Sequence, residues 1–350
     1  MNNDTGVGNS TSYVVYRIVF LTGTSTICIS GLLGYTCLIY LILRHRKSMF
    51  SNPYYSLAVS LGIPDCLTLL TGLMYPIPAV AWGTEVLPDW YRAVVGFTAI
   101  MAWFVLGSHV CVLAVNRLIA ISNLDAYLGY FQSWKIACII VCCWLYGVVN
   151  AALMYGCSCQ YFHQDFSWAF MCGGQETCAE VAIKINMALS YGKTLFVTSI
   201  YAVIFIKVKR SARISDCSRN HVLAAKMRQE RALIIQFAAV CGVLDLYIGC
   251  FFLVQPFLSD QLSPGPLFSC ALTMLWMLNS AINPFLDIIF GADVKASIRQ
   301  LWLNRRGALK DTISSSTILQ PAPLTCTTPM PRPVSNQSLF IISLDSPLRE

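Results

Sequence analysis

Charged residues are scarce in this chain of 350 residues: Asp, Glu, Lys and Arg together make up 12%, whereas hydrophobic residues make up 56%. A soluble globular domain carries charge on about a quarter of its residues, so the composition excludes that class. Lys and Arg outnumber Asp and Glu by 24 to 17, but no nucleic-acid-binding motif accompanies the excess, and no nucleic-acid partner is expected. Internal repeats are also lacking, which disfavours a transporter, because transporters more often carry paired broken helices in repeated halves.

The chain also lacks the short motifs that identify hydrolases and metalloproteases. It contains no H-E-x-x-H, no G-x-S-x-G and no paired aspartates in matching apolar runs, so neither an enzyme nor a cofactor or metal site is expected. The last apolar run, 267–290, has no Lys, which disfavours a retinal pigment because no Schiff base can form there. No cleavable signal peptide is evident, and the first apolar run is expected to act as a signal anchor.

Seven apolar runs are each long enough to cross about 30 Å of hydrocarbon as a helix. They cover residues 18–43, 54–75, 94–121, 134–155, 181–208, 232–258 and 267–290. Pro64 interrupts the second run, since proline removes a backbone donor. The sequence therefore predicts an all-α membrane protein whose seven-helix bundle spans residues 16–290.

The segments outside the bundle differ in composition. Residues 1–15 are polar at the start and contain N-x-[S/T] sequons at Asn3 and Asn9, which are candidate glycosylation sites. Residues 291–303 place apolar side chains at helical spacing beside Lys295 and Arg299, which predicts a short amphipathic helix on the inner leaflet. Residues 304–350 are rich in Ser, Thr and Pro without periodicity, so we expect a disordered cytoplasmic tail.

The placement of basic residues predicts the orientation in the membrane. They gather after the first run, in the segment 207–231 and after the last run, whereas the opposite side has only Arg17 and Arg92. Cytoplasmic loops carry the excess of Lys and Arg. We therefore expect a multi-pass plasma-membrane protein with its amino terminus outside the cell and its carboxyl terminus inside.

Four of the 16 cysteines lie together in one polar loop on the predicted outer side. That side is oxidising, so we expect disulfides within the loop. Four cysteines permit three pairings, and their spacing does not choose among them. The residues concerned are Cys157, Cys159, Cys172 and Cys178.

Polar residues are concentrated in the last apolar run. Hydrocarbon cannot hydrogen-bond amides or carboxylates, so side chains at this depth must face other helices or trapped water. Pro284 frees a backbone carbonyl, and we expect the helix to bend there. Such a helix suits a conformational switch. The residues that form this pattern are Asn279, Ser280, Asn283, Pro284 and Asp287.

This pattern resembles the seventh-helix motif of rhodopsin-like G-protein-coupled receptors, with Asp287 where that family usually has Tyr. The segment L-A-V-N-R-L-I-A-I resembles the family's D-R-Y region, with Arg117 in place and Asn116 replacing Asp. L-G-I-P-D, which ends at Asp65, resembles the family's second-helix segment, and Trp144 matches the single Trp of the fourth helix. The sixth run lacks C-W-x-P and the third lacks an outer Cys. This combination is similar to nematode serpentine chemoreceptors, with the class T group as one candidate.

The resemblance implies a receptor that couples an extracellular ligand to a heterotrimeric G protein by a change in helix packing. Arg117 and the basic segment 207–231 would meet the G protein when the bundle opens at its inner face. Because Asn116 cannot form the family's neighbouring ion pair, the resting contact of Arg117 must come from elsewhere, with Glu230 and Asp287 as candidates. Tyr201 would be the family's inner tyrosine of the fifth helix.

Two further sites follow from the resemblance. Asp65, with Asn279, Ser280 and Asn283, would hold water or Na⁺ midway through the bundle. A ligand would bind among the outer halves of the third, fifth, sixth and seventh helices. Lys193 and Asp245 would there partner each other or the ligand. Alternatively, Lys193 snorkels to the membrane surface and Asp245 bonds to backbone. The alternative is a ligand-gated channel or transporter of seven helices. The expected pocket residues are Trp103, Phe104, Tyr191, Lys193, Asp245, Tyr247, Phe251 and Trp276.

Overall fold

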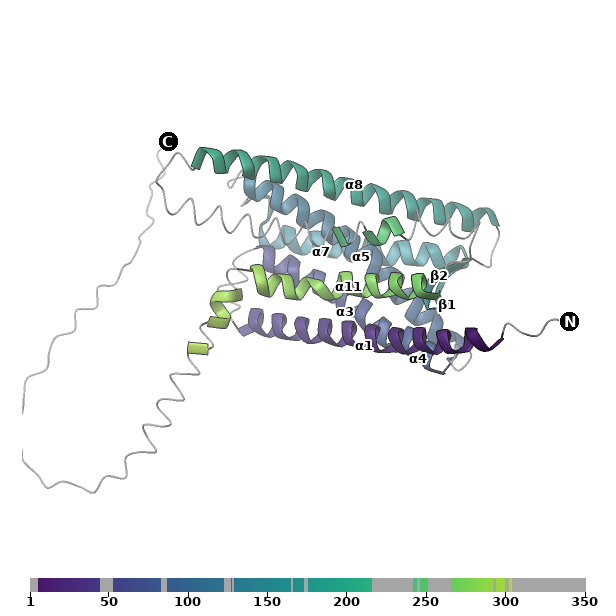
Figure 1. Cartoon of the computed structure of the whole chain (residues 1–350). Helices are drawn as coiled ribbons and strands as arrows, with labels where there is room; N and C mark the ends of the chain where they lie inside the picture. Colours follow the sequence, from purple (N-terminus) through teal and green to yellow (C-terminus); the bar gives the residue numbers. More distant parts are fainter. Residues whose placement is uncertain are drawn as a thin grey trace, which may run out of the picture. The chain divides into compact units, whose positions relative to one another are not determined.

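The structure is a computed structural model, and it divides the chain into a first unit, Met1–Leu301, and a second unit, Trp302–Glu350. Within the described part of the chain, six helices are long and apolar enough to cross a membrane, and they form the bundle in Figure 1. The predicted all-α membrane bundle is confirmed. Most of the predicted run 232–258 lies outside the described residues, although residues 246–250 are helical. The described residues are 6–44, 53–82, 87–122, 127, 129–164, 166–172, 176–215, 242–243, 246–250, 266–291, 294–299 and 302–303.

The helices extend beyond the apolar runs that predicted them, most of all at both ends of α8 and at the start of α1. Hydropathy marks where the hydrocarbon ends, whereas a helix continues into polar residues until a Pro, Gly or capping residue stops it. The main helices are α1 Gly6–Arg44, α3 Pro53–Met74, α4 Pro76–Trp82, α5 Asp89–Ser122, α7 Ser133–Gly156, α8 Glu176–Ser215 and α11 Pro266–Phe290.

The expected interruption at Pro64 is wrong, because α3 continues through this residue. A proline removes only one helical donor, and a helix inside a bundle tolerates the loss because neighbouring helices and polar side chains can satisfy the freed carbonyl. The break lies at Tyr75 instead, between α3 and α4. Tyr75 precedes Pro76, and a residue before proline is disfavoured in the α conformation, whereas proline is favoured as the first residue of the next helix.

Close helix packing in the bundle centres on α11 and on α5. α1 packs along α11, while α5 packs against α3, α7 and α8. A Cβ atom at Gly31 of α1 would lie 2.8 Å from the Cβ of Ala281 on α11, and one at Gly147 of α7 would lie 3.0 Å from the Met101 carbonyl of α5. Small residues allow such close backbone approach, which is a main source of helix association in lipid.

A β-hairpin that the sequence analysis did not predict fills the cysteine-rich loop. Strands β1 Cys159–Gln164 and β2 Ser167–Cys172 pair antiparallel, with Cys159 opposite Cys172. Cys157 and Cys178 form a disulfide across the base of this loop, and Cys159 is also disulfide-bonded. The expected disulfide within the loop is therefore present.

The tip of the hairpin is anchored in the bundle by Phe166. This residue has a φ of 68°, its side chain is 1% exposed, and its ring centroid lies 5.5 Å from that of Phe20 on α1. Its carbonyl accepts a hydrogen bond from Thr273 Oγ1 of α11 at 2.8 Å. The hairpin thus joins α1 and α11 at one end of the bundle, which we call the hairpin end.

After α11, residues 294–299 form a short helix within the predicted segment 291–303. Val294 is 1% exposed and belongs to a cluster with Leu41 of α1 and Tyr54 of α3, at the end of the bundle opposite the hairpin. Lys295 and Arg299 are exposed. One apolar side chain thus fastens this amphipathic helix to the bundle, while its basic residues point away from the core.

Candidate functional site

A buried carboxylate, Asp65 of α3, lies at the centre of a polar network contributed by three helices. Its Oδ2 accepts hydrogen bonds from the Tyr35 hydroxyl of α1 at 2.5 Å and from Asn283 Nδ2 of α11 at 2.8 Å. Ser280 of α11 also interacts with this carboxylate. A buried charge is stabilised when hydrogen-bond donors surround it, so these contacts fix α1, α3 and α11 relative to one another. We call Asp65, Tyr35, Ser280 and Asn283 the polar network.

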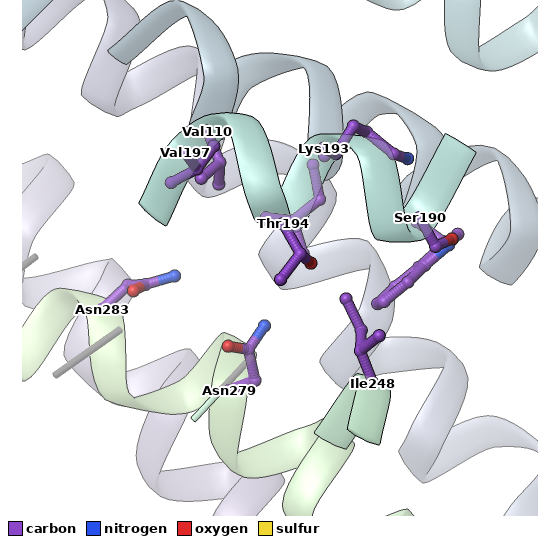
Figure 2. Close-up of a pocket in the computed structure, with 11 residues that line it drawn as sticks. Val110, Ser190, Lys193, Thr194, Val197, Ile248, Asn279 and Asn283 are labelled. Carbon is purple, nitrogen blue, oxygen red and sulfur yellow. The ribbon is translucent and has the colours of Figure 1, made fainter. Parts of the chain in front are cut away.

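Three of the four residues predicted for this network thus come together. The fourth, Asn279, lies one helical turn before Asn283, is 2% exposed and has an Oδ1 without a hydrogen-bond partner among the described residues. Figure 2 shows both Asn side chains reaching from α11 into one cavity. Tyr35 was missed, because a tyrosine in an apolar run gives no sequence signal of what its hydroxyl meets.

At the end opposite the hairpin, Arg117 contacts α11 through a tyrosine. The guanidinium carbon of Arg117 on α5 lies 3.8 Å from the ring centroid of Tyr54 on α3. The Tyr54 hydroxyl in turn donates to Asp287 Oδ1 of α11 at 2.8 Å. We call Arg117, Tyr54 and Asp287 the inner contact; it brings together two of the predicted residues and adds Tyr54.

Asn116, the neighbour of Arg117, is fully buried. It interacts with Tyr127, just after the membrane-spanning part of α5. Burial raises the pKa of the Tyr127 phenol, while the Asn116 hydrogen bond and the positive charge of Arg117 oppose that rise. Tyr127 also packs on Phe131, with ring centroids 5.3 Å apart. Asn116 therefore contacts the segment between α5 and α7, a role that sequence reasoning missed.

Of the other residues predicted for G-protein coupling, the structure describes Tyr201 and Pro284. Tyr201 of α8 is 8% exposed and belongs to the same cluster as Tyr54 and Val294. Pro284 lies within α11, which continues to Phe290. Glu230 lies outside the described residues, as does Asn3; Asn9 falls in α1, but its side chain is outside the described part.

A cavity of about 480 Å³ lies among α5, α8, α11 and Ile248 (Figure 2). Two predicted pocket residues, Trp103 and Lys193, line it together with Asn279 and Asn283. The cavity therefore shares Asn283 with the polar network. Its full lining is Trp103, Leu106, Gly107, Val110, Ser190, Lys193, Thr194, Val197, Ile248, Asn279 and Asn283.

A cluster of aromatic rings lies beside the cavity, on its side nearer the hairpin end. Tyr247 stacks on Trp276 of α11, with ring centroids 6.3 Å apart and an interplanar angle of 20°, and meets Trp103 of α5 edge-on at 5.6 Å. Phe104 is 1% exposed, and Tyr191 is partly buried against the same cluster. These four predicted residues thus lie near one another with Trp103, while Asp245 and Phe251 lie outside the described residues.

Lys193 of α8 brings a cation to this cavity. Its Nζ is buried and has no hydrogen-bond partner among the described residues. It lies 5.9 Å from the ring centroid of Trp103 and 5.2 Å from that of Phe104. Ser190 and Thr194, which sequence reasoning missed, line the same cavity. Ser190 and Thr194 are four residues apart and therefore share one face of α8, which is the signal that would have found them.

A second buried polar cluster serves packing. Ser60 Oγ of α3 lies 2.9 Å from His109 Nε2 of α5, and the other ring nitrogen of His109 lies 2.9 Å from the Val105 carbonyl. Trp144 of α7 donates to Ser60 Oγ at 3.4 Å. This cluster, which includes Trp144, ties α3, α5 and α7 together.

The family model described as serpentine type 7TM GPCR chemoreceptor Srv matches residues 24–302 of this chain. The match covers α1 from residue 24 onward, the other described membrane helices, the inner contact and the cavity. It confirms the resemblance to serpentine chemoreceptors and gives the Srv group, where the sequence analysis had named class T as one candidate.

Proposed function

Because this chain belongs to the Srv family of serpentine seven-transmembrane chemoreceptors, we propose that it couples an extracellular ligand to a heterotrimeric G protein. One observation carries the proposal: Asn283 and Asp287 lie four residues apart on one face of α11 and take part in different sites. Asn283 lines the cavity and donates to Asp65, and Asp287 accepts from Tyr54. A ligand that shifts α11 at the cavity therefore also acts on the inner contact.

The inner contact has the strength that a reversible switch requires. A cation over an aromatic ring contributes about 0.5–2 kcal/mol, and a hydrogen bond to a charged group about 1.5–3 kcal/mol. Together they favour the resting arrangement by roughly 30- to 4,000-fold, since about 1.4 kcal/mol is a factor of ten. A ligand overcomes this preference only by binding the other arrangement more tightly. Release of Arg117 from Tyr54 would then open a surface for the G protein.

We place the hairpin end outside the cell. The disulfide between Cys157 and Cys178 requires an oxidising compartment. Basic side chains lie at the other ends of the helices, including Arg44 of α1, Lys135 of α7 and Lys207 of α8, as expected for a cytoplasmic face. Lys207 Nζ also donates to Ser122 Oγ of α5 at 2.7 Å, which joins α5 and α8 where the G protein would bind. The membrane is the plasma membrane, and the carboxyl terminus is cytoplasmic.

The proposal is tested by a reporter screen of small molecules on cells that carry a promiscuous G protein. We expect a ligand that activates the wild-type receptor and loses its effect on Arg117→Ala at equal surface expression. A response that survives this substitution undiminished would refute the role of Arg117. Ligand-evoked current in cells without a G protein would instead identify a channel.

A further inference from the structure

Among the described residues, the lysine in the cavity has no partner for its positive charge. Lys193 Nζ has no hydrogen-bond partner among the described residues, and the ion pairs found there, Arg92–Asp89 and Lys184–Glu180, do not involve it. The two carboxylates of the described bundle interior bond elsewhere, Asp65 to Tyr35 and Asp287 to Tyr54. Ring faces stabilise an ammonium only in part, and an unpaired buried charge is costly.

The space beside Lys193 is kept open by a glycine. A Cβ atom at Gly107 of α5 would lie 2.8 Å from Lys193 Nζ, so a larger residue at this position would require the lysine side chain to move. Hydroxyls of Ser190 and Thr194 line the same cavity, and neither has a hydrogen-bond partner among the described residues. An ammonium and two unsatisfied hydroxyls are three donor groups that line one cavity, which is the complement of a carboxylate.

Much of the remaining lining of the cavity is apolar, apart from Asn279 and Asn283. Leu106, Val110, Val197 and Ile248 form its wall, and Trp103 lies near the ammonium. The geometry points to a small organic acid as the ligand class: its carboxylate binds Lys193, and its apolar tail lies along this wall. The inference rests on the proposed receptor function and specifies the ligand of that same cavity.

The positive charge of Lys193 favours an acid over the other ligand classes. An organic amine would place a second cation beside Lys193, where the low dielectric makes repulsion strong. A neutral ester or alcohol of the same shape would leave the ammonium without a counter-ion. The empty space of about 480 Å³ at this site includes open solvent at its mouth, so we expect a small ligand, such as a monocarboxylic acid with a short chain or one aromatic ring.

Such a ligand would also contact the switch helix. Asn279 lines the cavity from α11, and its Oδ1 is unpartnered among the described residues, as stated above. Figure 2 shows Lys193 on α8 and Asn279 on α11 at different walls of the cavity. An acid that reaches from one to the other bridges two helices, one of which carries Asp287 of the inner contact.

The test uses the purified full-length receptor in lipid nanodiscs, where binding requires no G protein. The probes are straight-chain and phenyl-substituted monocarboxylic acids, each paired with its methyl ester and its aldehyde. Thermal unfolding is followed as each probe is titrated. We expect at least one acid to stabilise the receptor at concentrations about 100-fold below its ester.

Three variants assign the effect to the ammonium. Lys193→Met keeps the length of the side chain without its charge, and we expect it to weaken acid binding at least tenfold while the receptor remains folded. Lys193→Arg keeps the charge and is expected to retain part of the affinity. Lys184→Met is the matched control, because Lys184 lies exposed on the same helix α8, and its affinity for acids should equal that of the wild type.

The inference is overturned if no acid stabilises the receptor, if the esters bind equally well, or if Lys193→Met binds acids as tightly as the wild type. An aldehyde that binds and is fixed by borohydride to Lys193 overturns it in favour of an imine. If Lys193→Met and Asp245→Asn each destabilise the receptor and the double variant recovers, Asp245 is the counter-ion and no acid is required. Acid binding without G-protein signalling would instead leave this inference standing and refute the proposed function.

Discussion

The Tyr54 hydroxyl donates a hydrogen bond to Asp287 Oδ1 across 2.8 Å, so a tyrosine from α3 meets the aspartate that stands where rhodopsin-like receptors usually have a tyrosine on the last helix. Arg117 contacts the ring of the same tyrosine. A single aromatic side chain therefore connects α5 to α11.

Removal of the Tyr54 hydroxyl is expected to activate the receptor without ligand. Tyr54→Phe keeps the ring beneath Arg117 but deletes the bond to Asp287, which costs the resting arrangement about 1.5–3 kcal/mol. Basal reporter signalling should rise several-fold at equal surface expression. Tyr40→Phe is the control, since that tyrosine is 54% exposed and bonds only to Arg44 on its own helix. Unchanged basal signalling in Tyr54→Phe would show that the inner contact does not hold the resting state.

The hydrogen bonds of the polar network are expected to stabilise the folded receptor, and the effects of removing them are expected to be non-additive. Asp65→Ala leaves the Tyr35 hydroxyl and the Asn283 amide buried without their acceptor, which should cost about 2–4 kcal/mol, whereas Asp65→Asn keeps one acceptor oxygen and should cost less. The double variant Tyr35→Phe/Asp65→Asn should lose less stability than the sum of the single losses, because both residues share one hydrogen bond. Thermal unfolding in nanodiscs measures all of these variants. Strict additivity would argue against the shared bond.

The cysteines of the loop are expected to resist a membrane-impermeant thiol reagent on intact cells until reductant is added. Cys157 and Cys178 are joined, and Cys159 is disulfide-bonded opposite Cys172 in the strand register, so we expect Cys159 and Cys172 to form the second bridge. The double variant Cys157→Ser/Cys178→Ser should lose about 2–4 kcal/mol of stability. Mass spectrometry of the unreduced receptor identifies the bridges. Labelling of Cys172 before reduction would contradict the second one.

Phe166 offers a test of the hairpin tip. Its ring is buried against Phe20 and Cys270, so Phe166→Ala should cost about 3–5 kcal/mol. Phe166→Gly loses the same ring but adopts the φ of 68° without a Cβ, which recovers about 1 kcal/mol. The glycine variant should therefore be the more stable of the two in thermal unfolding. The opposite order would mean that the tip does not keep this backbone conformation when the ring is removed.

The extent of the membrane helices follows from sequence because burial in lipid requires long apolar runs and little else. The partners of polar side chains do not follow so directly. Asp65, Asn283 and Asp287 stand out in apolar surroundings, but Tyr35 and Tyr54 do not, since the hydroxyl that matters is one atom on a largely apolar ring. Which tyrosine meets which carboxylate depends on the rotation of each helix, and that is set by packing at positions such as Gly31 and Gly147.

The loop was predicted from its cysteines and not from its strands. Residues 159–172 mix aromatic and polar side chains in a segment too short for an independent sheet. The local sequence therefore did not predict a hairpin. Its two ends are held by the disulfide between Cys157 and Cys178, and its tip is held by Thr273. These are tertiary constraints, and they determine a structure that local propensity leaves undecided.

The seam between Gly31 of α1 and Ala281 of α11 leaves no room for even one added methyl group. Two backbones in such contact cannot separate or roll past each other cheaply, so α1 and α11 behave as a single mechanical part. If α11 moves during signalling, we therefore expect it to move on its other side, toward the cavity that it shares with α8. The amino-terminal helix α1, which contributes no residue to the described cavity lining, would therefore move together with α11.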